Sequence, residues 1–297
     1  MEMVDVKCLH SSVQNDGARW HARLGHIGMD SLQLMIKKEL VLGIPKIEIK
    51  KEACEACMLG KQARQLFPQA TTYRAAERLE LIHGDLCGPI TPTTAAKKSY
   101  IFVLIDDHSR YMWTILLKEK GEAFEKFKIF KNIVEHETRT SIKTFRTDRG
   151  GEFTSTEFNR FWETSGIQRH LTAPYTPQQN GVVERRNRTL MEMTRSILKH
   201  MSLPNYLWGE AVRHACYLIN RVATRSLSSQ TPYEVFKGRK PSVKHLKVFG
   251  CIGYVKTESQ HLRKLDDRSR SLLHLGTEPG SKAVSYTHLT LPTICSV

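Results

Sequence analysis

The chain has 297 residues, and its 45 Lys and Arg against 30 Asp and Glu give it a formal net charge of +15 at pH 7. A chain of this length can hold one large domain and a smaller one. The positive charge indicates a polyanionic partner, nucleic acid before acidic lipid, although a merely basic surface would account for the charge nearly as well. No apolar run approaches the roughly 20 residues that cross a bilayer, so we expect no membrane span. The seven irregularly spaced cysteines favour a reducing compartment over a disulfide framework.

Four potential metal ligands come first along the chain. His21 and His26 are separated by four residues, and Cys54 and Cys57 belong to the run C-E-A-C. Two imidazoles and two thiolates are the N2S2 donor set that zinc accepts, and a segment this short would gain its stability from the metal. The cysteine pair alone fits a redox dithiol as well as a metal site. Together with the histidine pair, it predicts a structural zinc site.

Strand-like and helix-like runs follow from Leu79 onward. Three short apolar runs come first, and helical and extended periodicities then alternate. This order predicts an α/β domain with a mixed sheet flanked by helices. The expected strands are 79–86, 100–105, 111–117, 142–147, 167–172 and a run near Cys251, and the expected helices are 121–137, 155–165, the segment after Gly181, and 205–223.

Three acids stand at positions where they could share metal ions. Asp85 lies in an apolar run stopped by Gly-Pro, Asp148 closes a strand, and Glu184 begins a helix with 35 residues between it and Asp148. Cutting and joining phosphodiesters uses two divalent metals, and hard cations prefer carboxylate oxygens. Asp106 and Asp107 are the alternatives to Asp85. If their strand is the hairpin partner of the Asp85 strand, they lie at its far end and point away.

The helix that carries Glu184 has two distinct faces. Apolar residues recur at helical spacing and predict a buried face, whereas Glu184 heads a basic stripe on another face. The preceding residues, 175–181, are rich in turn formers and fit either a loop at the mouth of a site or a plain connector. The buried face is expected to hold Val183, Leu190, Met193 and Ile197, and the basic stripe Arg188, Arg195 and Lys199.

Nine motifs occur in a fixed order: W-H-A-R-L-G-H, C-E-A-C-M-L-G-K, I-H-G-D-L-C-G-P, I-D-D-H-S-R-Y, R-T-D-R-G-G-E-F, Y-T-P-Q-Q-N-G-V-V-E-R-R-N-R, P-N-Y-L-W-G-E-A-V, T-P-Y-E-V-F and H-L-K-V-F-G-C. Over roughly residues 19–282, the chain resembles the integrase region of Ty1/copia-type LTR-retrotransposon Gag-Pol polyproteins. The resemblance implies a small helical zinc-binding pre-integrase domain and an RNase H-like catalytic core with a D,D-35-E triad. It places the zinc ligands at His21, His26, Cys54 and Cys57, and the catalytic, metal-binding acids at Asp85, Asp148 and Glu184.

The resemblance also implies the reaction and its participants. Two Mg²⁺ or Mn²⁺ ions would sit at the three acids and one Zn²⁺ at the histidines and cysteines, and a DNA 3′-hydroxyl would attack a target phosphodiester. The partners would be double-stranded element DNA ends, host target DNA, further copies of the chain and other Gag-Pol products. The protein would pass through cytoplasmic virus-like particles and act in the nucleus. DNA contacts are expected from Gln178, Gln179, Asn180, Arg185, Arg186 and Arg188.

Two alternatives to an integrase stay open on the sequence. One is a catalytically inactive, zinc-containing DNA-binding protein, and the other is an RNase H-like nuclease that only hydrolyses. The residues from Ser285 depart from the family and resemble a translated sequencing-adapter string. The expected segments are a linker (1–18), the zinc-binding domain (19–68), a linker (69–78), the catalytic core (79–240), a C-terminal extension (241–284) and a non-native tail (285–297).

Overall fold

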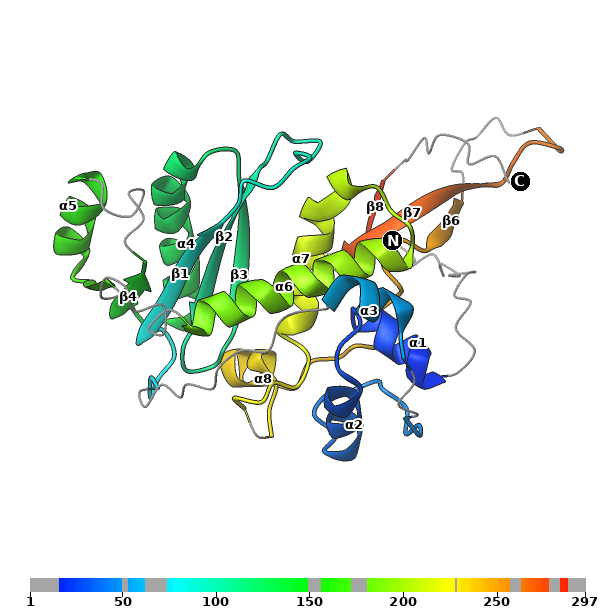
Figure 1. Ribbon diagram of the computed structural model, residues 1–297, viewed down its shortest axis with the longest axis horizontal. Helices are drawn as coiled ribbons and strands as arrows, with labels where there is room; N and C mark the ends of the chain where they lie inside the picture. The colour runs from blue at the N-terminus through cyan, green and yellow to red at the C-terminus, as the bar shows by residue number, and fades with distance from the viewer. Residues whose placement is uncertain are drawn as a thin grey trace.

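The computed structural model describes residues 16–49, 53–61, 74–148, 156–171, 181–227, 229–256, 263–277 and 284–287. In Figure 1 a small helical module from the N-terminal part of the chain lies beside a helix-flanked sheet, and a smaller sheet forms from the C-terminal part. None of the helices in these ranges is long and apolar enough to cross a membrane.

The main sheet has five strands in the order β3-β2-β1-β4-β5. β2 is antiparallel to β1 and β3, whereas β4 is parallel to β1 and β5. This is the mixed RNase H-like sheet that the sequence predicts, and each strand lies within two residues of its expected bounds. The strands are β1 (Leu81–Cys87), β2 (Tyr100–Asp106), β3 (Met112–Leu117), β4 (Thr144–Thr147) and β5 (Gln168–Leu171).

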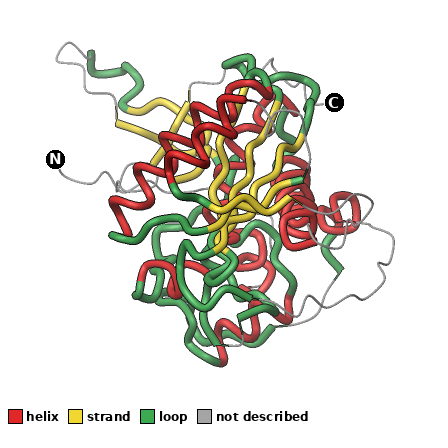
Figure 2. Tube along the Cα trace, turned by 90° about the vertical axis from the view of Figure 1, so that its left-hand side faces the viewer, coloured by secondary structure: helices red, strands yellow, loops and turns green. Residues whose placement is uncertain are grey.

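Alternating side chains of β2 explain why helices cover both faces of this sheet. Ile101, Val103 and Ile105 pack into one buried cluster with α6 and α7. Phe102 and Leu104 point the opposite way and pack with α4 and α5. Figure 2 shows the strands with helices on both sides. The helices are α4 (Ala123–Thr138), which follows the short turn η1 (Lys120–Glu122), α5 (Thr156–Ser165), α6 (Gly181–His200) and α7 (Trp208–Ile219), which follows the short turn η4 (Asn205–Leu207).

The described part of the N-terminal module shares its hydrophobic core with α6. Leu24, Ile27 and Leu32 belong to the same buried cluster as Leu190 and Met193 of α6. Burial of apolar surface is the main favourable contribution to folding, so this shared cluster joins the module and α6 into one packed body. The helices of the module are α1 (Asp16–Arg23), α2 (Met29–Lys37) and α3 (Glu55–Lys61).

A short capped helix and a second sheet follow α7. Helix α8 (Pro232–Lys237) begins after Thr231, whose hydroxyl accepts a hydrogen bond from the backbone N–H of Glu234 at 3.2 Å. The second sheet is antiparallel, with the order β6-β7-β8. Its third strand includes residues 285–287 of the expected non-native tail, and the rest of that tail lies outside the described residues. The strands are β6 (Ile252–Lys256), β7 (Ser269–Thr277) and β8 (Val284–Thr287).

Candidate active site and metal centre

Asp85 and Asp148 belong to neighbouring parallel strands. β1 and β4 pair with His83 opposite Arg146, and the same register continued by two residues sets Asp85 opposite Asp148. Residues that face each other across parallel strands project from the same face of the sheet. Both acids also lie near the carboxyl ends of their strands. The first two predicted acids therefore come together at one edge of the sheet.

Helix α6 brings Glu184 to this edge. Glu184 is exposed in the first turn of α6, and Asn187, three residues later, donates a hydrogen bond from Nδ2 to Oδ2 of Asp85. Residues three apart share a helix face, so Glu184 lies on the side of α6 that meets Asp85. Asn187 is not among the residues predicted from the sequence, although its spacing of three from Glu184 is a usable signal.

The three carboxylates interact electrostatically. Burial, followed by the negative charges of Asp148 and Glu184, raises the pKa of Asp85 to about 6, and the hydrogen bond from Asn187 opposes this rise. The carboxylates nevertheless do not converge on one point. Among the described residues, only the histidine and cysteine ligands described below place three or more ligand atoms close enough together to hold one ion. The three acids are thus close enough to influence the pKa of Asp85, but their carboxylates are not arranged around one point.

The alternative acids lie at the other end of the β1–β2 hairpin. Asp106 pairs with Ile82, whereas Asp85 pairs with Val103, so the expectation that Asp106 and Asp107 lie far from Asp85 is confirmed. Asp106 is fully buried and serves as an acceptor for the local backbone. It accepts hydrogen bonds from the N–H groups of Leu79 and Ser109.

Asp107 is the common acceptor of a buried hydrogen-bond network that includes His83. Its Oδ1 accepts from His83 Nε2 at 2.9 Å and from Arg110 at 2.7 Å, and its Oδ2 accepts from the N–H of Ala75 at 2.8 Å. His83 is 1% exposed, and burial lowers its pKa, so the ring is neutral and donates through Nε2. His83 is thus a packed histidine that helps to hold the Asp107 carboxylate.

Gly84 allows the strand beside Asp85 to pack closely. A Cβ atom added at Gly84 would lie 2.4 Å from Cζ of Phe145, on the sheet face opposite to α6. No side chain fits at that distance, so only glycine lets the Phe145 ring lie against β1.

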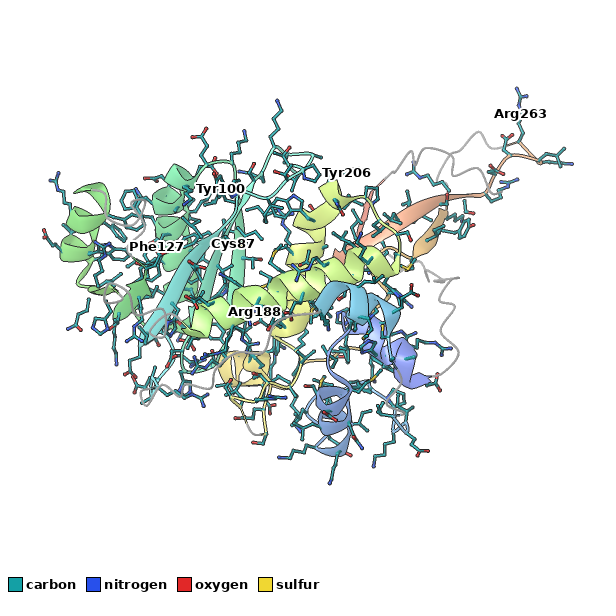
Figure 3. All side chains as sticks on the ribbon, in the orientation of Figure 1. Cys87, Tyr100, Phe127, Arg188, Tyr206 and Arg263 are labelled. Carbon is teal, nitrogen blue, oxygen red and sulfur yellow. The ribbon has the colours of Figure 1, made fainter. Side chains whose placement is uncertain are left out.

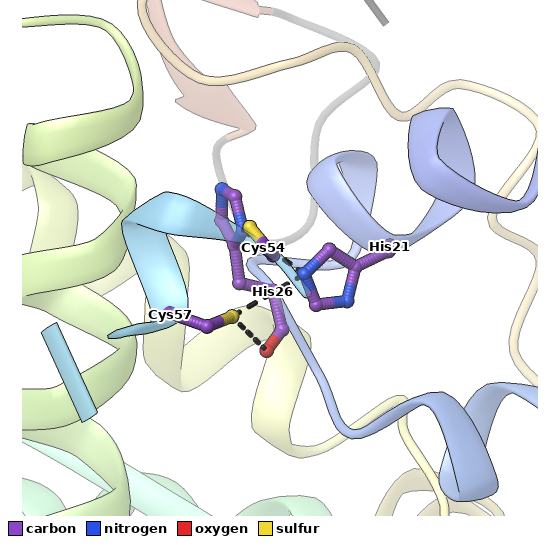
Figure 4. Close-up of side chains that lie close together, drawn as sticks. All are labelled: His21, His26, Cys54 and Cys57. Carbon is purple, nitrogen blue, oxygen red and sulfur yellow. Dashed lines mark hydrogen bonds between the residues drawn. The ribbon is translucent and has the colours of Figure 1, made fainter. Parts of the chain in front are cut away.

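The four predicted zinc ligands form one cluster (Figure 4). Their ligand atoms all lie within 4.8 Å of one another. His26 Nδ1 is 3.1 Å from His21 Nε2 and 3.2 Å from Cys54 Sγ, and Cys57 Sγ is 3.3 Å from His21 Nε2. Tetrahedral zinc with these donors needs ligand separations of about 3.4 to 3.8 Å. The three separations named above are a few tenths of an ångström shorter than this, so the donor set and the closeness of its atoms are compatible with a structural Zn²⁺ ion after a small adjustment.

The surroundings of the cluster favour the ligand forms of the imidazoles. His21 Nδ1 lies 2.7 Å from the carbonyl oxygen of Ile27, to which it donates, so the Nε2 lone pair faces the other ligands. Burial lowers the pKa of His21 to about 4 and that of His26 to about 2, so both rings are neutral at pH 7. Burial raises the pKa of Cys57 to about 11, and the nearby Lys61 opposes this rise. A coordinated cation deprotonates such a thiol.

The predicted DNA contacts differ in where they point. Arg185 and Arg188 are exposed, and Figure 3 labels Arg188 on α6. Arg186 is half-buried and donates to Thr224 Oγ1 at 3.3 Å, and burial, followed by the positive charge of Arg110, lowers its pKa to about 10. Arg186 therefore faces the protein in this structure. The remaining predicted contacts, Gln178, Gln179 and Asn180, lie outside the described residues.

Two family models match the chain. Residues 1–62 match the GAG-pre-integrase domain, and residues 75–177 match the integrase core domain. The chain is 40% identical over 257 residues to the retrovirus-related Pol polyprotein from transposon TNT 1-94 of Nicotiana tabacum, which covers 86% of this chain and 19% of that protein. It is 34% identical over 284 residues to the Pol polyprotein from transposon RE1 of Arabidopsis thaliana, covering 95% of this chain and 18% of that protein.

Solved structures of integrase cores are also similar. The HTLV-2 integrase catalytic core domain in complex with magnesium has 19% sequence identity and a TM-score of 0.43, covering 55% of this chain and 99% of that chain. The BIV integrase catalytic core domain has 21% identity and a TM-score of 0.40, covering 54% of this chain and 95% of that chain.

The chain carries a GAG-pre-integrase domain and an integrase core domain, as its motifs indicate. The relatives named above are Pol polyproteins of plant transposons. The chain spans less than a fifth of the length of the curated relatives that it matches.

Proposed function

We propose that the chain is a retrotransposon integrase that inserts element DNA into host DNA by metal-dependent strand transfer. The observation that carries this proposal is the grouping of Asp85, Asp148 and Glu184, from two strands and a helix, close enough that the charges of Asp148 and Glu184 act on Asp85. In an integrase core, such a group would hold two Mg²⁺ or Mn²⁺ ions. When bound, these ions activate a DNA 3′-hydroxyl and stabilise the charge that builds on the attacked phosphate.

The residues around the acids have defined parts in this proposal. Asn187 holds the Asp85 carboxylate by a hydrogen bond and so fixes its orientation. Asp85 must lose its proton to act as a ligand, and its pKa of about 6 allows this at neutral pH. Arg185 and Arg188 are exposed near Glu184 and would contact backbone phosphates, which contribute most of the affinity for DNA.

We further propose that one Zn²⁺ binds His21, His26, Cys54 and Cys57 as a structural ion. The spacing of the four ligand atoms and the neutral state of both imidazoles support this assignment. The proposed macromolecular partners are element DNA ends, host target DNA, further copies of the chain and other Gag-Pol products. The proposed site of action is the nucleus, after passage through cytoplasmic virus-like particles.

A labelled donor-to-target joining assay with Mg²⁺, run beside a reaction with EDTA, tests the proposed activity. We expect joined products only with Mg²⁺. Glu184→Gln removes a charged ligand at nearly constant volume, so it should abolish joining while DNA retention in a filter-binding assay stays within about twofold, because phosphate contacts are made elsewhere. Cleaved but unjoined DNA would identify a nuclease that only hydrolyses. DNA retention without cleavage or joining would identify a non-catalytic DNA-binding protein.

A further inference from the structure

The turn between the two histidine ligands packs directly onto the catalytic helix α6. Gly25 lies between His21 and His26 and has a φ of +67°. A Cβ atom at Gly25 would lie 2.7 Å from Cδ1 of Leu218 in α7 and 3.0 Å from Sδ of Met193 in α6. The backbone that carries the histidines therefore touches both helices.

Helix α3, which carries Cys57, makes a second contact with α6. A Cβ atom at Gly60 would lie 2.5 Å from Oγ and 3.1 Å from the backbone nitrogen of Ser196. Arg195 Nε donates a hydrogen bond to the carbonyl oxygen of Gly60 at 3.1 Å. Figure 1 shows α3 lying against α6. The backbones of the two helices are thus close enough that a larger side chain at Gly60 would push them apart.

A third contact joins a zinc ligand to the end of α6. The ring of His26 meets the ring of His200 edge to face, with centroids 4.7 Å apart and an interplanar angle of 68°. His200 is the last residue of α6. All three contacts fall in the C-terminal half of the helix, on Met193, Ser196 and His200.

Glu184 lies at the opposite end of the same helix. α6 has 20 residues and would span about 30 Å at 1.5 Å per residue. A continuous helix moves as a unit, so the direction in which the zinc module holds its C-terminal half also sets the position of its first turn. The buried cluster around Met193 and Ile197, in this C-terminal half, includes residues of the module as well as residues of α7 and β2.

We infer that Gly60, Ser196 and His200 are positioning residues, through which the zinc-loaded module fixes the helix that carries Glu184. The importance of Glu184 rests on the proposed function, whereas the contact between module and helix does not. An independently folded DNA-binding unit, joined to the core only by a linker, would not require the backbone of Gly25 and Gly60 to be packed against α6.

The test compares Gly60→Leu with Gly121→Leu. Gly121, in the η1 turn, has no atom within 4 Å of an added Cβ, so it is a matched glycine control. We expect Gly60→Leu to keep one zinc per chain while hydrogen–deuterium exchange rises in residues 190–200 and stays unchanged in α4, on the other face of the sheet. The Mg²⁺ concentration for half-maximal joining should rise at least about fivefold, the lower end of typical couplings between two sites. Gly121→Leu should change neither quantity.

Two further measurements distinguish loss of the contact between the module and α6 from misfolding of the Gly60→Leu variant. Gly60→Ala is a smaller change that should raise exchange in residues 190–200 in the same direction. Treating the unaltered protein with a chelator that prefers Zn²⁺ to Mg²⁺ should also raise exchange there. Unchanged exchange in residues 190–200 after zinc removal, or an unchanged Mg²⁺ requirement in a zinc-loaded Gly60→Leu protein, would overturn the inference. If even the unaltered protein joins no DNA, the proposed function fails, and the exchange measurements still decide the docking.

Discussion

Replacing Asp107 with Ala should destabilise the fold strongly, because Asp107 accepts three hydrogen bonds. The donors are Ala75 N–H at 2.8 Å, His83 Nε2 at 2.9 Å and Arg110 at 2.7 Å. The side chains of Asp107 and Arg110 are 3% and 11% exposed, so the substitution leaves a mostly buried guanidinium without its carboxylate. Removing one partner of a buried ion pair costs about 3 to 5 kcal/mol. Since Arg110 keeps some contact with solvent, we expect a loss of about 3 kcal/mol.

The pH dependence of stability gives a second estimate of how much the Asp107 carboxylate contributes to the free energy of unfolding. Burial alone would raise the pKa of Asp107, but hydrogen bonds from His83 and Ala75 and the charge of Arg110 lower it to about 2. The folded-state pKa therefore lies below the ordinary value of 3.8, so the stabilisation is fully present above about pH 4 and is lost as the pH falls towards 2. At 1.36 kcal/mol per pKa unit, the difference is on the order of 2 kcal/mol.

Urea-induced unfolding at pH 7 and at pH 3 measures both quantities. The control is Asp16→Ala, because Asp16 pairs with Arg19 at an exposed site where the side chains are 63% and 43% exposed. Such a pair contributes less than about 1 kcal/mol. A cost of Asp107→Ala below about 1 kcal/mol at pH 7, or an equal cost at both pH values, would show that the buried Asp107–Arg110 pair does not stabilise the fold as expected.

Three further outcomes are expected. Gly84→Val should lower the free energy of unfolding by about 1 to 3 kcal/mol, because its Cβ would meet the Phe145 ring, and an unchanged urea midpoint would contradict this. Mg²⁺ affinity should fall as the pH drops below about 6, the pKa of Asp85, because the carboxylate must lose its proton to bind the ion. Calorimetric titration with Mg²⁺ at pH 5.0 and at pH 7.5 measures this change, and equal affinities would count against Asp85 as a ligand. His21→Ala should abolish zinc binding, and it should also lower the melting temperature of the whole chain, because the module shares its core with α6. One zinc retained per chain in metal analysis would exclude His21 as a ligand.

The local pattern of the sequence was sufficient to predict the sheet and the cluster of zinc ligands. In β2 the side chains alternate between two buried faces, so the whole strand is apolar and its bounds are easily recognised. The buried face of α6 was also predicted correctly, since Val183, Leu190, Met193 and Ile197 are all buried. These features depend on neighbours within one helix or strand.

Features that depend on how elements cross one another were predicted less well. The hydrogen bond from Asn187 to Asp85 joins residues 102 positions apart, so only the packing of α6 on β1 reveals it. Arg186 was expected to contact DNA, yet it lies three residues after Val183 and four before Leu190, both of which are buried. Helical spacing could have placed Arg186 on the inner side. The DNA contacts and the segment boundaries themselves remain predictions.

The shared core determines where this polypeptide can be divided. A fragment that began at Arg74 would lack Gly25, which packs against Met193 and Leu218, and the module residues that share a buried cluster with Leu190, so these side chains would become more exposed. Contiguous exposed apolar surface promotes self-association, so we expect such a fragment to aggregate. Adding residues 16–61 as a separate zinc-loaded peptide should restore its solubility, which makes complementation between two pieces a practical way to prepare the catalytic sheet.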